Sequence, residues 1–486
     1  MKLKRIISVV IASLFILTML PMSAAAAQKG IKLSKTSLTL AVDETAALTR
    51  TVTGYKKYTV QWSSSDKTVA TVSKGKVTAK KEGTATITAR IKGTDYKATC
   101  KVTVTKKSTG KASSGGNSSV RTAEQVVADM KIGWNLGNSL DAIGGYDISS
   151  ETAWGNVKTT KGLITAIKKA GFNTIRIPTT WGSHLDADGN INKAWLDRVQ
   201  EVVDYAYDND MYVILNMHHD NGVFPLDEKN EAATTKKYKN VWKQIAERFK
   251  DYDEKLLFEG RNEPRTEGSA KEWTGGTKAE WDVLNRMYEA FVSTVRATGG
   301  NNKTRILVVA PYAASSSYTA MAALKVPDDD RVVVAVHAYS PYNLSLNGDM
   351  AYKTFDENGK KEIDDVFKNI DKAYLSKGIP VIMDEFGVTD KGNTEERIKA
   401  YKYFLSTAKK YGVPCVHWDN GATGTGSEKY GMINRTTYEW YYPEILKAIM
   451  DSVKELQKYK KMPNDKNSIG NFLYNFFLKT CQAFFD

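Results

Sequence analysis

Residues 171–220 have the sequence GFNTIRIPTTWGSHLDADGNINKAWLDRVQEVVDYAYDNDMYVILNMHHD, and this stretch decides the fold of the larger part of the chain. Two short apolar runs near its ends, Thr174–Pro178 and Tyr212–Met217, are typical of buried strands. Between them, Trp195–Tyr207 has the 3.6-residue apolar spacing of an amphipathic helix. A strand, a helix and a second strand in this order predict a parallel β-α-β unit.

The same alternation continues through most of the chain. Apolar runs typical of buried parallel strands are Ile132–Leu136, Thr174–Pro178, Tyr212–Met217, Leu256–Glu259, Ile306–Ala310, Val332–Val336, Pro380–Met383 and Val413–Val416. Segments with helical spacing lie between them, among them Lys278–Thr298, Ile363–Ser376 and Thr394–Tyr411. Eight strand–helix repeats in residues 120–460 favour a closed (β/α)8 TIM barrel over an open doubly wound sheet. No glycine-rich phosphate loop follows any of these runs, which argues against a nucleotide site.

Length and composition set the limits around this barrel. The 486 residues exceed one compact core of ordinary size, so we expect at least two folding units. A hydrophobic fraction of 42% and a charged fraction of 26% exclude a mostly disordered, collagenous or multispanning membrane protein. Three cysteines without a CxxC pair exclude a disulfide scaffold and argue against a zinc ribbon.

The first 27 residues predict a secretory signal peptide. Three basic residues come first, the apolar run Ile6–Leu20 follows, and Ser23–Ala27 consists of small residues. About 15 apolar residues are too few for a helix across a bilayer core of roughly 30 Å. We therefore expect a secreted protein, extracellular or associated with the cell surface, with no membrane segment after cleavage.

Residues 28–105 predict a small β-sandwich, because short period-two stretches alternate with turn residues there. These stretches are Ser37–Val42, Tyr58–Ser63, Val69–Ser73, Thr84–Ile91 and Ala98–Val104. Cys100, which stands alone in one of them, is expected to be a small buried side chain. Residues 106–119 (KKSTGKASSGGNSS) predict a flexible linker, and the tail 461–486 has no assigned role.

The positive charge belongs to the N-terminal module. Residues 28–111 hold 18 Lys or Arg against 5 Asp or Glu, whereas residues 112–486 have a net charge of −2. The overall charge of +14 therefore does not predict nucleic-acid binding. Two interpretations remain open: the module binds an anionic cell-wall polymer, or it is a soluble spacer without a partner.

The chemistry is expected where the barrel strands end, because the catalytic groups of such barrels lie on the carboxyl-terminal face. Four of the five histidines fall at these ends. Glu263 follows the fourth run and Glu385 the seventh, so the two carboxylates would face each other across the mouth. A facing carboxylate pair is what cleavage of a glycosidic bond requires, and its separation decides between retention and inversion of configuration.

Ordered motifs along the barrel resemble a known family. The segments GWNLGNSLDA, ETAWGN, GFNTIRIPTTW, LNMHHD, FEGRNEPR, VHAYSPY, MDEFG and HWDNG resemble glycoside hydrolase family 5 over about residues 122–455, most closely its subfamily 4. The stretch VQWSSSDKTVATVSKGKVTAKKEGTATITA resembles the bacterial Ig-like group 2 domain.

The resemblance implies a retaining endo-β-1,4-glucanase acting on cellulose, mixed-linkage glucan or xyloglucan. It makes Glu263 the acid/base, whose pKa should be raised, and Glu385 the nucleophile. It implies sugar or nucleophile contacts from Arg176, His218, Asn262, His337, Tyr339, Trp418 and Asn138. Trp154 and Trp181 are further candidates for substrate contact, although core packing explains each equally well. Asp384 is expected to point away from the mouth, because it precedes the nucleophile on the strand.

No cofactor and no metal are expected, because the sequence has no HExxH or HxH element. We expect a monomer whose main partner is the polysaccharide. Two other functions remain open. The same machinery could act on β-mannan or xylan, or the chain could be a non-catalytic wall-binding or carbohydrate-binding protein.

Overall fold

The computed structural model describes residues 29–459 except 43–44, 56, 106–119 and 146. The predicted signal peptide, linker and tail therefore lie outside the described residues. The chain divides into two compact units, residues 1–116 and 117–486. No helix among the described residues is long and apolar enough to cross a membrane.

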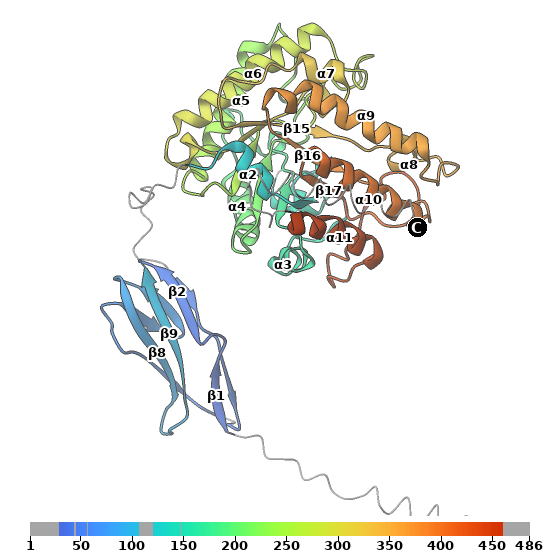
Figure 1. Cartoon of the computed structure of the whole chain (residues 1–486). Coiled ribbons are helices and arrows are strands. Elements are labelled where there is room, and N and C mark those ends of the chain that lie inside the picture. The colour runs from blue at the N-terminus through green and yellow to red at the C-terminus, as the bar shows by residue number, and fades with distance from the viewer. Residues whose placement is uncertain (1–28, 43–44, 56, 106–119, 146, 460–486) are drawn as a thin grey trace, which may run out of the picture. The chain divides into compact units, whose positions relative to one another are not determined.

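The N-terminal unit is built of short strands in separate sheets (Figure 1). One sheet has the order β2-β9-β8-β5, a second has the order β3-β7-β6, and β1 pairs with β4. The strands are β1 (Gly30–Leu33), β2 (Ser37–Ala41), β3 (Thr45–Ala47), β4 (Arg50–Thr53), β5 (Val60–Ser64), β6 (Ala70–Ser73), β7 (Lys76–Ala79), β8 (Gly83–Ile91) and β9 (Lys97–Thr105). Five of them match the predicted stretches. The other four have only three or four residues, too few to display a clear alternation. Cys100 is fully buried in the core, as expected.

The second unit contains a closed barrel of eight parallel strands, which confirms the predicted fold class. The strands are β10 (Ile132–Leu136), β11 (Thr174–Ile177), β12 (Tyr212–Asn216), β13 (Leu256–Glu259), β14 (Leu307–Val309), β15 (Val332–His337), β16 (Val381–Phe386) and β17 (Cys415–Asp419). Pairing of β10 with β17 closes the ring. The last strand begins two residues later than expected, after Pro414, which has no N–H to donate to a neighbouring strand.

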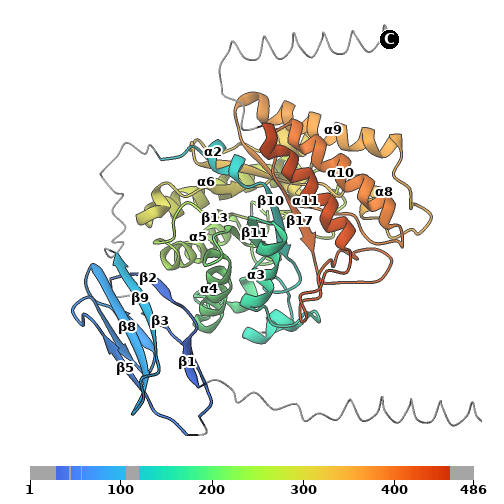
Figure 2. The same ribbon diagram turned by 60° about the horizontal axis from the view of Figure 1, so that its bottom comes forward.

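Helices surround the barrel (Figure 2). They are α3 (Lys161–Ala170), α4 (Lys193–Tyr207), α5 (Glu231–Arg248), α6 (Lys278–Ala297), α7 (Tyr318–Ala323), α8 (Tyr342–Ser345), α9 (Glu357–Ala373), α10 (Thr394–Lys410) and α11 (Pro443–Tyr459). Some of their ends are encoded locally. In α6, Thr277 and Glu280 form a capping box, and α3 stops at Gly171, whose φ of 118° disfavours other residues.

The barrel has two apolar layers. Outward side chains of the strands pack against the helices, as Ile175 and Val199 do. Inward side chains such as Ile214 and Val333 form a second cluster. The short helix α2 (Ala123–Asp129) adds Val126 to this inner cluster. Because α2 leads directly into β10, it closes the amino-terminal end of the barrel, so the opposite end is the accessible one.

The inner face changes from apolar to polar toward the carboxyl end of the strands. Because inward positions recur every second residue, the residue two positions after an inner apolar one also faces inward. These pairs are Ile214 and Asn216, Leu257 and Glu259, Ala335 and His337, Ile382 and Asp384, and Val416 and Trp418. The strand alternation thus builds an apolar floor with a layer of polar and aromatic groups above it.

Candidate active site

Glu263 and Glu385 meet at the carboxyl end of the barrel, although 122 positions separate them in sequence. His337 lies between them, with Nδ1 at 2.9 Å from Glu263 Oε1 and 3.6 Å from Glu385 Oε2. One oxygen of each carboxylate and one nitrogen of the imidazole all lie within 4.8 Å of one another. The structure therefore brings the two acids into a single site, as the strand ends predicted.

Arg176 lies beneath this site and donates hydrogen bonds to several of its residues. Its fully buried guanidinium donates to both carboxylate oxygens of Glu259, at 2.6 and 2.7 Å. It also donates to Glu385 Oε1 at 2.6 Å, to Asn262 Oδ1 at 2.6 Å and to Asn135 Oδ1 at 3.0 Å. Burial opposes its charge, but these carboxylates outweigh burial and hold the pKa of Arg176 well above its usual value. A permanent cation therefore lies directly beneath Glu385.

Glu385 is held from two sides and is 5% exposed. Arg176 donates to Oε1, and the Tyr339 hydroxyl donates to Oε2 at 2.7 Å. Burial and the neighbouring charge of Glu385 raise the pKa of Tyr339 well above its usual value, so this phenol keeps its proton. Two donors with fixed positions leave the carboxylate in one orientation.

The expectation for Asp384 is wrong. The pairing of β15 with β16 shifts register between Val336 and His337, so that His337 is paired with Glu385 and Asp384 is skipped. This irregularity lets two consecutive residues face the barrel mouth, which strict alternation forbids. Asp384 Oδ1 lies 3.2 Å from His337 Nε2, and Asp384 Oδ2 lies 3.4 Å from Arg176 Nε. Asp384 thus belongs to the charged layer below the two glutamates.

The expected rise in the pKa of Glu263 is also wrong for this arrangement. Burial raises the pKa of Glu263, but the hydrogen bond and charge of His337, together with the charges of Arg265 and His219, outweigh burial and lower it. Burial lowers the pKa of His337, but the charges of Glu385 and Asp384 outweigh burial and raise this pKa well above the usual range. The Glu263–His337 pair therefore carries one proton near neutral pH, and that proton resides on the imidazole.

Trp418 and His218 form an aromatic wall beside the carboxylates. Their rings are parallel, with centroids 5.8 Å apart and an interplanar angle of 1°. Burial lowers the pKa of His218 well below its usual value, and its Nδ1 is 3.0 Å from Asn216 Nδ2. A Cβ at Gly137 would lie 2.7 Å from the Trp418 ring, so the indole position requires glycine there.

The two asparagines predicted for the site occupy different settings. Asn262 is 3% exposed, and its Oδ1 accepts from Arg176, which orients its amide nitrogen away from the guanidinium. Asn138 follows β10 with a left-handed φ of 56°. Its N–H donates to Asp141, and its carbonyl accepts from Asn156, so its backbone organises the loop beside the last strand.

The two remaining tryptophans differ in their burial. Trp181 is fully buried in the core, and its Nε1 donates to the carbonyl of Asn216. Contact of Trp181 with substrate is therefore wrong, because its indole has no exposed surface. Trp154 is 43% exposed and packs against the His219 ring at 5.3 Å. It remains available to a ligand on the carboxyl-terminal face.

Sequence reasoning gave no role to two residues that the structure brings to the site. Glu259 lies two positions after the inward Leu257 and forms the bidentate pair with Arg176. A carboxylate inside a buried strand needs a charged or hydrogen-bonding partner, and its position in such a strand could have identified Glu259 as part of the site. Arg265 donates from Nη1 to Glu263 Oε2 at 3.3 Å. The only sequence signal that Arg265 belongs to the site was its position close to Glu263 in the chain.

Among the described residues, two groups have the spacing of metal ligands: Asp141 with His218 and His219, and Glu263 with His337 and Glu385. Protein partners already engage members of each group. Asp141 accepts from the N–H groups of Asn138 and Ser139, and Glu385 accepts from Arg176 and Tyr339. The donor sets are explained without an ion.

Exposed apolar side chains gather on the same face. Within the described part of the barrel unit after its first strand, every large exposed apolar residue follows the carboxyl end of a strand, either in the connecting segment or at the first residue of a short helix in it. These residues are Ile143, Ile148, Trp154, Val157, Trp273, Tyr318, Tyr342, Met350, Tyr352 and Tyr441. Clustered exposed apolar surface is typical of a binding face.

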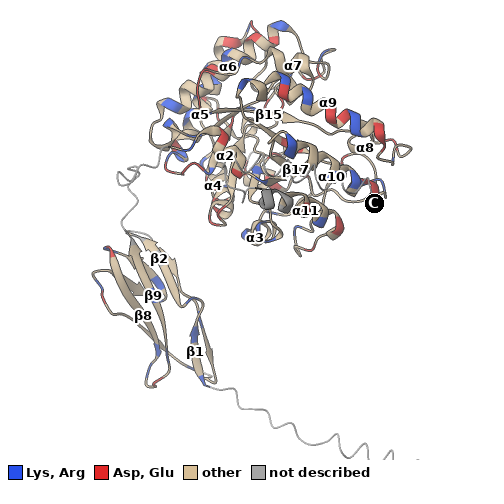
Figure 3. Ribbon diagram, in the orientation of Figure 1, with Lys and Arg blue, Asp and Glu red and all other residues tan. Residues whose placement is uncertain are grey.

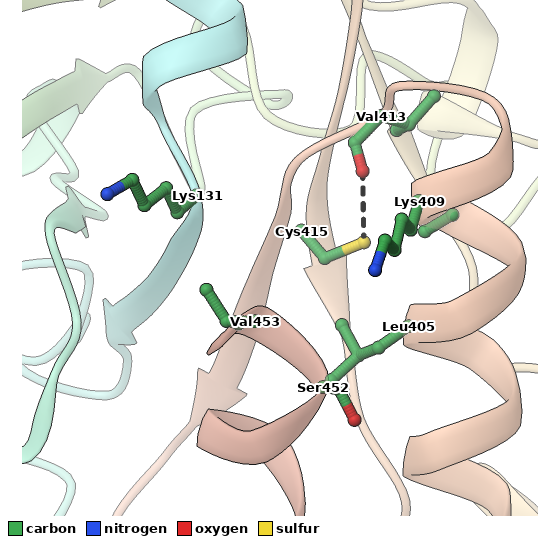
Figure 4. A pocket seen from close by; sticks show the side chains of 8 residues that line it. Lys131, Leu405, Lys409, Val413, Cys415, Ser452 and Val453 are labelled. Carbon is green, nitrogen blue, oxygen red and sulfur yellow. Dashed lines mark hydrogen bonds between the residues drawn. The ribbon is translucent and has the colours of Figure 1, made fainter. Parts of the chain in front are cut away.

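A small cavity lies at the other end of the strands (Figure 4). Lys131, Val413 and Cys415 line it where β10 and β17 begin, together with residues of α10 and α11. Its lining holds no carboxylate or histidine, and the Cys415 Sγ faces the carbonyl of Val413. The carboxylate cluster, not this cavity, is therefore the site of chemistry.

A TIM barrel with two glutamates within reach of one bond at its carboxyl end defines a glycoside hydrolase. The family model "Cellulase (glycosyl hydrolase family 5)" matches residues 141–424, and the model "Bacterial Ig-like domain (group 2)" matches residues 27–102. The chain belongs to glycoside hydrolase family 5 and carries an Ig-like domain of group 2.

Individual relatives agree with this assignment. The chain is 45% identical to Endoglucanase A of Clostridium longisporum over 348 residues, 70% of this chain and 67% of that protein. It is 43% identical to Endoglucanase A of Ruminococcus albus, covering 68% of this chain and 93% of the relative. A solved GH5-4 broad specificity endoglucanase from C. longisporum has a TM-score of 0.67 and 44% identity, covering 69% of this chain and 99% of that one. The xyloglucan-specific XEG5A in complex with cellotriose has a TM-score of 0.66 and 43% identity, covering 67% and 97%.

Proposed function

We propose that this enzyme is a secreted endo-β-1,4-glucanase that cleaves β-glucans with retention of configuration. The observation that carries the proposal is the approach of Glu263 and Glu385, whose nearest ligand oxygens lie within 4.8 Å together with His337. Retaining enzymes hold their two carboxyl groups about 5–5.5 Å apart, whereas inverting enzymes leave room for a water between them. The short separation supports direct attack by a carboxylate.

In the first step Glu385 attacks the anomeric carbon as the bond to the leaving oxygen breaks. Glu263 gives a proton to that oxygen, and a glucosyl ester of Glu385 forms. Arg176 and Tyr339 present the nucleophile in one orientation. The proton starts on His337 and crosses the 2.9 Å hydrogen bond to Glu263 before it is donated.

In the second step water attacks the same carbon and the ester bond breaks. Glu263, now a carboxylate, accepts a proton from the water, and Glu385 is released as a carboxylate. Esterification removes the charge of Glu385, one of the charges that raise the pKa of His337. Asn262, oriented by Arg176, would donate to the sugar 2-hydroxyl, and Trp418 would pack on the sugar ring.

The names of the relatives support β-1,4-glucan as the substrate class. They include endoglucanases, a xyloglucan-specific enzyme and lichenases. We expect the purified protein to release reducing ends from carboxymethylcellulose, mixed-linkage glucan or xyloglucan. Faster release from β-mannan or xylan than from all three glucans would redirect the proposal to those backbones. No release from any of the five polymers would favour a non-catalytic binding protein.

The shared proton predicts a pH effect of His337→Gln. In the wild type, activity should persist at alkaline pH and fall as pH rises through the raised pKa of His337, because the pair then loses its proton. In the variant Glu263 must hold the proton alone, so the alkaline limb of kcat/KM should move to lower pH, with a loss of about a hundredfold near neutrality.

The control for this prediction is His417→Gln, because His417 lies on the outer side of β17 against Tyr401. Its pH profile should keep the wild-type shape. An unchanged alkaline limb in His337→Gln would contradict the shared proton.

We also propose that the Ig-like domain attaches the secreted enzyme to an anionic cell-wall polymer. Its strands and turns carry exposed lysines, among them Lys32, Lys57, Lys67 and Lys76, with few acidic residues between them (Figure 3). Export rests on the leader-like sequence of residues 1–27. Attraction between such a surface and a polyanion weakens with salt.

Deleting residues 28–105 should leave hydrolysis of a soluble β-glucan within about twofold of the full chain, because the barrel has a core of its own. Retention on purified cell walls at low salt should be lost. A pull-down at low and high salt measures it. If the full chain does not bind walls even at low salt, the attachment proposal fails; if the folded truncation loses its specific activity, the barrel depends on the module.

A further inference from the structure

Two exposed tyrosines stand at one end of the Ig-like domain. Among the described residues of this domain, Tyr58 at 45% and Tyr96 at 42% are the most exposed large apolar side chains. Tyr58 precedes β5, and Tyr96 lies in the turn between β8 and β9. The two segments are neighbours, because the N–H of Lys92 in that turn donates to the carbonyl of Thr59 at 2.9 Å. The exposed aromatic surface of the domain is therefore gathered in one place.

These tyrosines continue the inner side of the main sheet beyond its apolar core. Val60 and Ala98 pack against the small apolar cluster that contains Ile91. Tyr58 stands two positions before Val60, and Tyr96 stands two positions before Ala98. Because inward positions recur every second residue, both tyrosines lie on the side where the core would continue. The domain ends there, which leaves both rings partly open to solvent.

The support beneath the rings is fixed by contacts. Tyr55 packs on the same cluster, and its ring meets the Tyr96 ring edge-on, with centroids 6.2 Å apart. The Thr94 hydroxyl donates to the carbonyl of Ile91 at 3.0 Å and accepts from the N–H of Tyr96 at 3.2 Å. Arg90 Nε donates to the Thr94 carbonyl at 2.6 Å. An ordered aromatic surface of this kind loses little entropy when a ligand binds.

Positive charge surrounds the tyrosines. Exposed lysines in and beside the segments 54–59 and 92–96 are Lys29, Lys57, Lys92 and Lys97. The Lys29 ammonium lies 5.5 Å from the centroid of the Tyr55 ring. Asp95 is the acidic residue of these two segments, and it is paired with Arg90 at 2.6 Å. The aromatic end of the domain is therefore basic and complements a negatively charged ligand.

The chain leaves for the barrel from the other end of the domain. The last strand, β9, starts at Lys97 beside the tyrosines and runs to Thr105 (Figure 1). Nine residues in a strand span about 30 Å. The connection to the barrel therefore does not start beside the tyrosines, and a long polymer can run across them.

Aromatic rings and lysines together define the class of polymer that fits. The C–H faces of sugar rings pack on aromatic rings, and carboxylates pair with ammonium groups. A neutral glucan would use the rings and leave the lysines without a role, whereas a polyphosphate would use the lysines alone. A chain of uronic acids offers a sugar face and a carboxylate on every unit, so it uses both kinds of group.

We propose that Tyr58, Tyr96 and the lysines around them form a binding surface for a uronic-acid polysaccharide of the cell wall. The proposal rests on the wall attachment proposed above for the Ig-like domain, and it names the surface and the class of polymer. A polymer distinct from the β-glucan substrate keeps the enzyme in the wall while the glucan beside it is hydrolysed.

The test is calorimetric titration of the full chain with polygalacturonate and, as a polyanion without sugar rings, with polyphosphate. We expect the wild type to bind polygalacturonate and to lose affinity as salt rises. Tyr58→Ala combined with Tyr96→Ala should weaken this binding about tenfold and leave binding of polyphosphate unchanged. Replacing both tyrosines with phenylalanine, which keeps the ring faces, should recover most of the affinity. Hydrolysis of a soluble β-glucan should be the same in all these proteins.

A matched pair of charge variants tests the lysines. Lys92→Gln combined with Lys97→Gln should weaken binding to polygalacturonate more than Lys80→Gln combined with Lys81→Gln. The second pair removes the same charge from exposed lysines in the turn before β8, at the end from which the chain continues to the barrel. Equal losses in the two pairs would show that the charge acts without regard to place, and would overturn the surface.

Equal affinity of the wild type and the alanine variant for polygalacturonate would also overturn the surface. A wild type that is retained on cell walls but does not bind polygalacturonate would overturn the class of polymer, while the wall attachment stands. A wild type that binds neither walls nor polygalacturonate would overturn the attachment itself, so the two failures are distinguishable.

Discussion

Glu385→Gln is expected to lower kcat on β-glucans by about four orders of magnitude or more, while substrate binding stays close to the wild-type value. Glutamine fills nearly the same volume, and its amide oxygen can still accept from Arg176, while its NH2 group takes the place of the oxygen that accepts from Tyr339; a neutral amide does not attack the anomeric carbon. Initial rates and calorimetric titration with cellotetraose separate the two effects. Turnover near the wild-type rate would show that Glu385 is not the nucleophile.

Glu263→Gln is the matched partner of this variant, and it should behave differently. Loss of a general acid costs about 10²–10⁴-fold when the leaving group needs a proton. A dinitrophenyl cellobioside has a leaving group that departs without one, so the first step should stay fast and glycosyl-enzyme should accumulate. Mass spectrometry of a digest should find the added sugar on Glu385. An adduct on another residue, or none with a rapid burst, would contradict the assigned roles.

Arg176→Leu is expected to destabilise the barrel by about 3–5 kcal/mol and to abolish activity, because Glu259, Asp384 and Glu385 lose their common cation. The loss should be larger at pH 8 than at pH 5. Burial raises the pKa of Glu259 to about 7 even with Arg176 present, so this carboxyl is protonated at the lower pH and then needs no cation. Urea unfolding at the two pH values measures both effects.

The control is Arg286→Leu, which removes another bidentate arginine pair, with Glu231, at a position where the arginine is 52% exposed. Exposed pairs contribute about 0–1 kcal/mol, so this variant should unfold close to the wild type. Equal stability of the Arg176 and Arg286 variants would show that the buried arginine does not hold the carboxylates in place. Arg176→Lys keeps the charge but not the planar fork, and it should recover only part of the stability.

The strand ends identified most of the site because a parallel barrel collects them on one face. Glu263, Glu385, His337, Arg176 and Tyr339 all come together there. Trp418 does so as well, because inward positions recur at every second residue. Among the strand residues, the prediction was wrong only about the direction in which the side chain of Asp384 points. Asp384 faces inward because it lies two positions after the inward Ile382, and a register shift between β15 and β16 brings the next residue, Glu385, to the mouth as well. No residue of the strand indicates that shift.

Burial and charge coupling were the other quantities that the residue pattern could not provide. Trp181 and Trp154 both stand in loops after strands, yet one is sealed in the core and the other is 43% exposed. The expected rise in the pKa of Glu263 considered burial or a neighbouring negative charge. The structure adds a histidine at 2.9 Å, whose hydrogen bond and charge, together with the charges of Arg265 and His219, outweigh desolvation.

Taken alone, the order of residues determined the (β/α)8 barrel, the Ig-like domain in front of it and the identity of the two glutamates, because local periodicity and ordered motifs are properties of neighbours along the chain. Only the folded molecule decided how far apart these glutamates lie and which of them shares a proton. Such relations depend on distances of a few ångströms between segments far apart in sequence, and these distances exist only after the ring of strands has closed.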